Sequence, residues 1–244
     1  MFIQSFLLLL AIGFLSAGRV PRPEERIIGG QNIEIEQAPW QVSLQVNGEP
    51  HCGGSIYSKD IIITAAHCRF DKKKRRLEAR DFLIRVGSSL SNSKGTLVKV
   101  AAIRSHENYN STNFTKDIAV MRLSEPLNFT DKVKSIPLAE RNPAPGTVAM
   151  VSGWGATSTY AKYSYPVHLH GVDVLILRVD QFFIFAGSYG QTTCYGDSGG
   201  PLVVDQQLVG VVSAGYTYCD GRTQYISVSD ERSWLLNAIA SIKL

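Results

Sequence analysis

Three short motifs carry side chains that together could perform nucleophilic catalysis. His67 follows an apolar run in "TAAHC", Asp117 precedes another in "KDIAVMRL", and Ser198 lies in the glycine-rich stretch "GDSGGP". A serine hydroxyl is a weak nucleophile unless a base takes its proton, and an acid must hold that base in the right tautomer. Each residue alone would more often be structural. Their joint occurrence, in one of the three chain orders known for such triads, predicts a Ser-His-Asp triad.

The elements that must position these residues are short strands. The segments are rich in Val, Ile and Tyr and are separated by Gly, Pro, Asn and Ser. No ten-residue helical pattern lies between them, which argues against βαβ units and for antiparallel barrels or sandwiches. The predicted strand segments are "WQVSLQV", "SIYSKDIIITAA", "LVKVAAI", "DIAVMRL", "TVAMVSGW", "VDVLILRV", "PLVV", "QLVGVVSAG" and "TQYISV".

The C-terminal stretch "ERSWLLNAIASIKL" has a different pattern. Its apolar residues recur at helical spacing, which predicts an amphipathic helix over about residues 231–242. We expect this helix to pack against the body of the protein and to carry no chemistry.

The N-terminal stretch "MFIQSFLLLLAIGFLSAG" is apolar and ends in small residues. It is shorter than the ~20 apolar residues that a membrane span needs, and no later segment is long enough. A buried core helix is the alternative, but the polar, proline-bearing stretch "RVPRPEER" follows at once. We therefore interpret residues 1–18 as a signal peptide, cleaved near Ala17 or Gly18, and expect a secreted, extracellular protein.

The composition is that of an ordinary globular protein. The 244 residues are 44% hydrophobic and 19% charged, and they suffice for one large or two small domains. The formal net charge of +4 is too small to indicate a nucleic-acid or membrane partner, and we expect neither.

The cysteines and the glycosylation sequons fit an oxidising, extracellular destination. Four cysteines are expected to pair as two disulfides, and their spacing leaves three pairings open. Three Asn-X-Ser/Thr sequons are candidates for N-glycosylation, at Asn110, Asn113 and Asn128.

From residue 27 to the C-terminal helix, the chain resembles the trypsin/chymotrypsin-like serine peptidases, particularly small insect members. The motifs "RIIGG", "PWQVSL", "CGGSI", "TAAHC", "DIAV", "SGWG" and "GDSGGPL" carry the resemblance. It implies a peptidase domain over residues 27–244, built of two antiparallel six-stranded β-barrels over about 27–135 and 136–230. His67 and Asp117 would come from the first barrel and Ser198 from the second.

The resemblance also implies roles for further residues. The backbone N–H groups of Gly196 and Ser198 would form an oxyanion hole, and Ser213 would hydrogen-bond the triad acid. The disulfides would join Cys52 to Cys68 and Cys194 to Cys219. A further bridge that is usual in the second barrel is absent, because only "FFIF" stands where relatives carry a longer loop with two cysteines.

The segment "PEER/IIGG" implies synthesis as a zymogen. Residues 19–26 would be a propeptide, and cleavage after Arg26 by a trypsin-like protease would free the amine of Ile27 to pair with Asp197. An unpaired buried carboxylate is costly, so the new ammonium would order the neighbouring loop. The expected partners are this activating protease, protein or peptide substrates, and protease inhibitors, and the expected state is a monomer.

The specificity pocket departs from the trypsin pattern. Thr192, followed by Thr193, stands six residues before Ser198, where trypsins have the aspartate that pairs with a substrate Lys or Arg. Thr223 occupies a wall position that is often glycine, while Gly215 keeps the family glycine at the mouth. Ala214 stands where relatives usually have tryptophan. We expect a shallow, uncharged pocket for medium or small apolar side chains, although Asp220 is a possible source of charge.

Two loops carry further hypotheses. Residues 69–81, "RFDKKKRRLEARD", contain five consecutive basic residues. They are either a solvated loop or an electrostatic filter on the leaving-group side that favours acidic substrates. Residues 82–106 contain no Asp or Glu where many trypsins bind calcium, which prefers carboxylate ligands, so we expect no metal and no cofactor.

Two classes of function follow from these patterns. The first is a secreted serine endopeptidase made as a zymogen. The alternative is a non-catalytic, protease-like binding protein, for which the shortened loop and Ala214 would mark a degraded substrate cleft.

Overall fold

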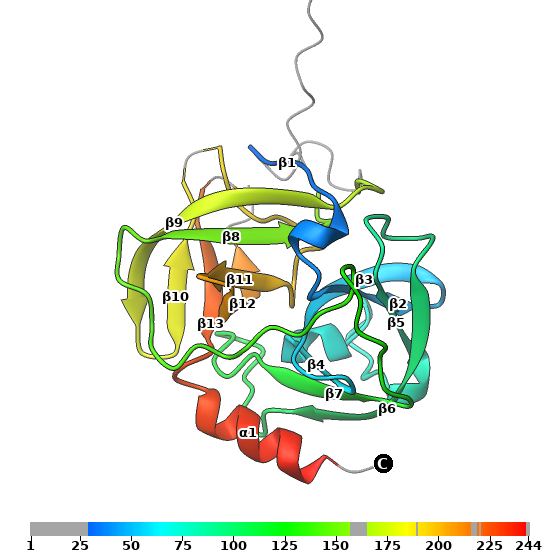
Figure 1. The fold of residues 1–244 in the computed structure, drawn as a ribbon. Helices are drawn as coiled ribbons and strands as arrows, with labels where there is room; N and C mark the ends of the chain where they lie inside the picture. Colours follow the sequence, from blue (N-terminus) through cyan, green and yellow to red (C-terminus); the bar gives the residue numbers. More distant parts are fainter. Residues whose placement is uncertain (1–28, 157–164, 189, 216–218, 220, 243–244) are drawn as a thin grey trace, which may run out of the picture.

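The structure is a computed structural model that describes residues 29–156, 165–188, 190–215, 219 and 221–242. The expected signal peptide and propeptide, together with Arg26, Ile27 and Asp220, lie outside the described residues. The strands form two barrels that lie against each other, and the helix α1 lies beneath them in the view of Figure 1.

The first barrel is a closed sheet with the strand order β2-β3-β4-β7-β6-β5. Burial alternates along β5, "FLIRV", where the first, third and fifth side chains are buried and the other two are partly exposed. This period of two directs one face of the strand to the barrel interior. The six strands are β2 (Gln41–Val46), β3 (Glu49–Ile56), β4 (Ile61–Thr64), β5 (Phe82–Val86), β6 (Thr96–Ser105) and β7 (Ala119–Leu123).

The second barrel closes through the pairings of β8 with both β9 and β11 in a sheet ordered β1-β9-β10-β13-β12-β11-β8. Its strands are β8 (Val148–Gly153), β9 (His170–Asp180), β10 (Phe183–Ala186), β11 (Pro201–Val204), β12 (Gln207–Gly215) and β13 (Thr223–Ser227). The short strand β1 (Gln31–Asn32) pairs with β9, so the N-terminal residues of the described chain lie on the second barrel before the chain enters the first. The expected pair of six-stranded antiparallel barrels is confirmed.

The two barrels meet through buried polar contacts and close backbone approach. Ser152 Oγ donates a hydrogen bond of 2.7 Å to Gln41 Oε1, and Gly53 N donates one of 2.8 Å to Ser198 O. A Cβ added to Gly53 would lie 3.1 Å from Gly200 Cα, so the glycine allows the backbones to approach. The serine of the second barrel is thereby held directly against the first.

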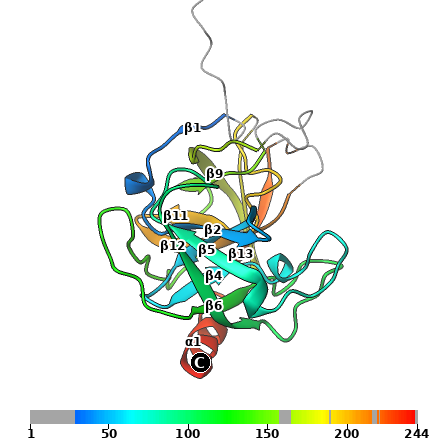
Figure 2. The same cartoon turned by 90° about the vertical axis from the view of Figure 1, so that its right-hand side faces the viewer.

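The helix α1 (Arg232–Ser241) follows the second barrel but packs on the first (Figures 1 and 2). Leu235 and Ala238 are fully buried, and Arg122 Nη1 on β7 donates to Ile242 O at 2.9 Å. This confirms a C-terminal packing helix. Three short 3-10 helices complete the described elements: η1 (Ile35–Gln37), η2 (Ala66–Arg69) and η3 (Ala79–Asp81). None of the helices in the described ranges is long and apolar enough to cross a membrane.

Candidate active site

His67 lies in η2, directly after strand β4 of the first barrel. The four residues of β4, "IIIT", are all buried, so packing in the barrel holds the strand that leads to the histidine. The Cys52–Cys68 disulfide joins η2 to β3, and this is one of the two pairings that the family resemblance implied. The imidazole is 23% exposed, which leaves it accessible to a substrate.

Asp117 is fully buried and accepts three hydrogen bonds. Its Oδ1 accepts from the backbone N–H of His67 at 2.8 Å, and its Oδ2 accepts from His67 Nδ1 at 2.7 Å and from Ser213 Oγ at 2.6 Å. Because a carboxylate only accepts hydrogen bonds, His67 Nδ1 carries the proton of that contact. In the neutral ring Nε2 is then left as the basic nitrogen. The carboxylate thus sets both the tautomer and the orientation of the imidazole.

Ser198 lies in a turn that requires glycine on both sides. Gly196 has φ +100° and Gly199 has φ +79°. Residues other than glycine rarely adopt these backbone conformations. A Cβ on Gly199 would lie 2.2 Å from Thr64 Oγ1, so no larger residue fits there. Within the described chain, no hydrogen bond joins Ser198 Oγ to His67. Such catalytic contacts are often long in the absence of substrate.

The backbone N–H groups of Gly196 and Ser198 donate no hydrogen bond to any of the described residues. Most backbone donors in protein interiors are paired, so two unpaired donors beside the serine are available to an oxygen atom of a ligand. A Cβ on Gly196 would lie 3.0 Å from the Tyr165 ring, which further restricts this position to glycine.

Asp197 is a buried carboxylate, 1% exposed, next to the serine. Its two oxygens accept hydrogen bonds from Gly155 N at 2.7 Å and Cys194 N at 2.9 Å. Burial raises the pKa of Asp197 from 3.8 to about 6, although the two N–H donors act in the opposite direction. No cationic side chain forms an ion pair with it in the described ranges.

A pocket of about 270 Å³ opens beside His67 and Ser198. Thr193, Thr223 and Gly215 line it, and the Cys194–Cys219 disulfide, the second implied pairing, forms part of its wall. Thr223 Oγ1 hydrogen-bonds Thr192 Oγ1 at 3.0 Å and Thr193 Oγ1 at 2.7 Å. The three buried hydroxyls therefore satisfy one another, and no carboxylate belongs to the described lining.

The sequence patterns did not single out Phe114 as a site residue. Its ring makes an edge-to-face contact with the His67 imidazole, with ring centroids 6.0 Å apart, and it lines the same pocket. Its backbone has φ +57° in a tight turn, in which Phe114 N donates to Asn110 O. An aromatic residue in the mostly polar segment "NYNSTNFTKD", just before Asp117, was the available signal.

Lys116, the residue before Asp117, connects the two barrels at the shortened loop. Its ammonium lies 2.6 Å from Glu231 Oε1 and 3.7 Å from the centroid of the Phe182 ring. Phe182 lies in the turn between β9 and β10, for which the family resemblance implied a longer loop in relatives. Glu231 is almost fully buried at the start of α1. An ion pair and a cation–π contact thus brace this region in a chain without the family's further disulfide.

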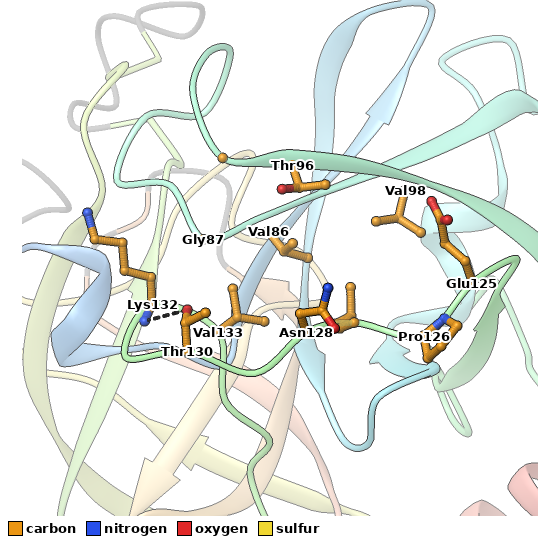
Figure 3. A pocket seen from close by; sticks show the side chains of 12 residues that line it. Val86, Gly87, Thr96, Val98, Glu125, Pro126, Asn128, Thr130, Lys132 and Val133 are labelled. Atoms are coloured by element: carbon orange, nitrogen blue, oxygen red, sulfur yellow. Dashed lines mark hydrogen bonds between the residues drawn. The ribbon is translucent and has the colours of Figure 1, made fainter.

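The remaining sequence predictions fall on the surface. Asn110, Asn113 and Asn128 are exposed. Figure 3 shows Asn128 beside a separate cavity of about 400 Å³ between the β5–β6 region and the segment after β7; it contains none of the expected catalytic residues. In the loop after Gly87, the carbonyl oxygens of Asn92 and Lys94 accept hydrogen bonds from Arg85 at 3.1 and 2.5 Å.

One group of potential metal ligands occurs in the described residues, namely Cys52, His67 and Cys68. The two sulfur atoms form a disulfide with each other, so they are not the thiolates that a metal would bind. His67 Nδ1 is in turn engaged by Asp117. This group is therefore poorly suited to hold a metal ion.

Comparison with known proteins decides the family. The family model described as Trypsin matches residues 27–235. The chain belongs to the trypsin family. Trypsin beta of Drosophila erecta is 42% identical over 241 residues, covering 92% of this chain and 93% of that protein. Trypsin alpha of Drosophila melanogaster is 41% identical and covers 94% of each chain. These matches make the protein a serine endopeptidase of the trypsin family.

Solved structures agree with this trypsin fold. Mouse neuropsin, a serine protease expressed in the limbic system of the brain, superposes with a TM-score of 0.77 at 29% identity, covering 86% of this chain and 98% of that one. The scabies mite inactivated protease paralogue S-D1 superposes with a TM-score of 0.81 at 28% identity, covering 88% and 97%. The same fold is thus found in a protein named as a protease and in one named as inactivated.

Proposed function

We propose that this trypsin-family protein hydrolyses peptide bonds with His67, Asp117 and Ser198. Ser198 Oγ attacks the substrate carbonyl carbon while His67 Nε2 takes the hydroxyl proton, and the same nitrogen then protonates the leaving amine. Water, deprotonated by His67, next attacks the acyl-enzyme ester and releases the acid and the free serine. The observation that carries the proposal is the bonding of Asp117 to both His67 Nδ1 and Ser213 Oγ, which fixes the basic nitrogen at the pocket.

The oxyanion that forms in each step needs hydrogen-bond donors. The unpaired N–H groups of Gly196 and Ser198 are suited to this role. Removal of one such donor in related enzymes costs roughly 3 to 4 kcal/mol of transition-state stabilisation.

We propose a preference for medium or small apolar side chains in the pocket. Thr193 and Thr223 line the pocket, and the expected base residue Thr192 is not among its lining residues. The hydroxyl of Thr223 already hydrogen-bonds those of Thr192 and Thr193. A buried Lys or Arg side chain would lack an ionic partner there, and a charge buried without one is strongly disfavoured. Thr223 Oγ1 would lie 3.8 Å from a Cβ added to Gly215, so these two residues face each other and limit the pocket's width.

Activation is proposed to follow cleavage after Arg26 by a trypsin-like protease. The new ammonium of Ile27 would pair with Asp197, whose buried carboxylate has only backbone N–H partners in the described chain. An ion pair would compensate for the burial of this charge. Secretion, removal of residues 1–18, and N-glycosylation at one or more of Asn110, Asn113 and Asn128 complete the proposal. Intact mass before and after glycosidase treatment of protein from the culture medium tests all three.

The test of catalysis uses protein cut after Arg26 and a fluorophosphonate probe, which labels an activated serine. Labelling is expected for the cleaved protein and is expected to be absent from the Ser198→Ala variant. Uncut Arg26→Gln protein is the matched control for activation, and its labelling should be much slower. A peptide-library digest then reports specificity, and predominant cleavage after Lys or Arg would contradict the proposed pocket.

The same experiment separates the enzyme from a non-catalytic binding protein. That alternative is kept because the similar mite protein is named as an inactivated paralogue. Correctly cleaved and folded protein that behaves identically to Ser198→Ala, with neither labelling nor peptide hydrolysis, would favour the alternative.

A further inference from the structure

The five consecutive basic residues after His67 belong to an ordered hairpin. Phe70 and Arg76 form an isolated antiparallel bridge, and we call residues 70–76 the basic hairpin. Asp71 fixes its tip: the carboxylate accepts hydrogen bonds from the backbone N–H groups of Lys73 and Arg75 at 2.8 and 2.9 Å, and from Arg75 Nε at 2.7 Å. The charges are therefore held on a defined scaffold.

Ion pairs within the segment leave three positive charges unpaired. Arg75 pairs with Asp71 at 2.7 Å, and Arg76 pairs with Glu78 at 3.5 Å. Three exposed lysines form no ion pair with any described residue: Lys72, Lys73 and Lys74. The tip of the basic hairpin thus presents a net positive surface.

The basic hairpin begins three residues after the catalytic histidine, and the segment between them contacts His51. His51 Nε2 hydrogen-bonds Cys68 O at 2.9 Å, between His67 and the hairpin. Burial is the main cause that lowers the pKa of His51, and the charge of Lys72 acts in the same direction.

The basic hairpin is not part of the specificity pocket. Neither the Cys52–Cys68 disulfide nor any hairpin residue lines that pocket, whereas His67 does. His67 Nε2, at the edge of the pocket, lies 3.9 Å from Cys68 Sγ, two residues before the hairpin. The exposed lysines of the hairpin are therefore available to substrate residues that lie outside this pocket.

We propose that the basic hairpin binds acidic side chains that follow the cleaved bond, so that the enzyme favours substrates with Asp or Glu on the leaving-group side. The inference rests on the proposed function and adds a substrate class to it. Unlike the neutral pocket, this part of the site would select by charge. Because the lysines are exposed, the preference should weaken as salt screens the charges.

Two quenched fluorescent peptides test the proposal. They are identical except for Asp-Glu or Asn-Gln at the second and third positions after the cleaved bond. For the cleaved wild-type protein at low salt, we expect kcat/KM to be about three- to tenfold higher for the acidic peptide, which is the size expected of a few exposed ion pairs. The ratio should fall toward one in 0.5 M NaCl and in the triple variant Lys72→Gln, Lys73→Gln, Lys74→Gln.

A matched triple variant, Lys99→Gln, Lys132→Gln, Lys134→Gln, removes the same charge from other exposed positions of the first half of the chain, and none of these lines the pocket. It should keep the wild-type ratio. An unchanged ratio in the hairpin variant, an equal loss in both variants, or a wild-type ratio of one would overturn the inference. In those cases the neutral peptide is still hydrolysed, and the proposed function stands. Failure to hydrolyse either peptide would instead refute the proposed function and, with it, this inference.

Discussion

The contribution of the buried Asp197 carboxylate to the unfolding free energy should depend on pH in opposite directions before and after cleavage of the zymogen. In the described structure, burial raises the pKa of Asp197 from 3.8 to about 6. The folded, uncleaved chain then binds this proton more tightly than the unfolded chain does. Stability from this group is therefore present at low pH and is lost as the pH rises from about 4 to about 6.

The size of this loss follows from the same pKa difference. One pKa unit corresponds to about 1.4 kcal/mol, so the change from 3.8 to about 6 corresponds to about 3 kcal/mol of unfolding free energy. After cleavage, an ammonium partner would lower the pKa of Asp197 instead. The contribution of this residue would then increase with rising pH through the acid range.

Urea unfolding between pH 4 and pH 8 measures this effect. The uncleaved state is held by Arg26→Gln, and both uncleaved and cleaved proteins carry Ser198→Ala to prevent autolysis. Asp197→Asn is introduced into each, and only the pH dependence of the difference between parent and variant is analysed. Asp197→Asn also alters the hydrogen bonds from Gly155 N and Cys194 N. The resulting loss of unfolding free energy is the same at every pH and therefore does not affect the pH dependence.

The expected difference changes by about 2 kcal/mol across pH 4 to 6 in the uncleaved protein. In the cleaved protein it has a small slope of opposite sign, because a lowered pKa places most of the change below pH 4. A flat difference in the uncleaved protein would show that burial does not perturb this carboxylate. The same slope in both forms would show that no ammonium pairs with Asp197, and the proposed activation step would be wrong.

Four further predictions concern the site and its supports. Ser213→Ala removes the 2.6 Å hydrogen bond to Asp117 and should lower kcat about tenfold with little change in KM, as steady-state kinetics would show; an unchanged kcat would contradict its positioning role. Thr192→Asp places a carboxylate next to the pocket residue Thr223 and should raise kcat/KM for Lys or Arg peptides at least about tenfold. Failure to do so would mean that a charge at this position does not reach the substrate. Lys116→Met removes the ammonium that pairs with the buried Glu231, and it should lower the unfolding free energy, measured in urea, by about 2 to 3 kcal/mol. The control Lys134→Met breaks an exposed pair with Asp131 and should lower it by less than about 1 kcal/mol. Calcium and EDTA should give the same melting temperature, since Arg85 already donates to the loop carbonyls of Asn92 and Lys94; a rise with calcium would reveal a cation site.

Runs rich in Val, Ile and Tyr, separated by turn residues, were enough to predict most of the strands and the antiparallel barrels. The strand β5, "FLIRV", was not among the predicted segments, although its buried positions follow a period of two. The sequence did not predict that β1 would pair with β9, because a two-residue strand has too short a pattern to identify its partner. Cysteine spacing likewise left three disulfide pairings open, and the family resemblance was needed to select the two that the structure contains.

The sequence by itself determined which residue types are present for chemistry: a histidine, an aspartate and a serine in motif context, glycines around the serine, and threonines in place of a pocket aspartate. Only the tertiary structure decided how they meet. Packing of the two barrels against each other brings Ser213 to Asp117, and the fold of the second barrel brings Thr223 to Thr192, residues far apart in the chain. The contacts of Phe114 with His67 and of Lys116 with Phe182 likewise join separate segments. A local pattern reports propensity and periodicity, whereas such contacts depend on how distant segments pack, and that is fixed only when the whole fold forms.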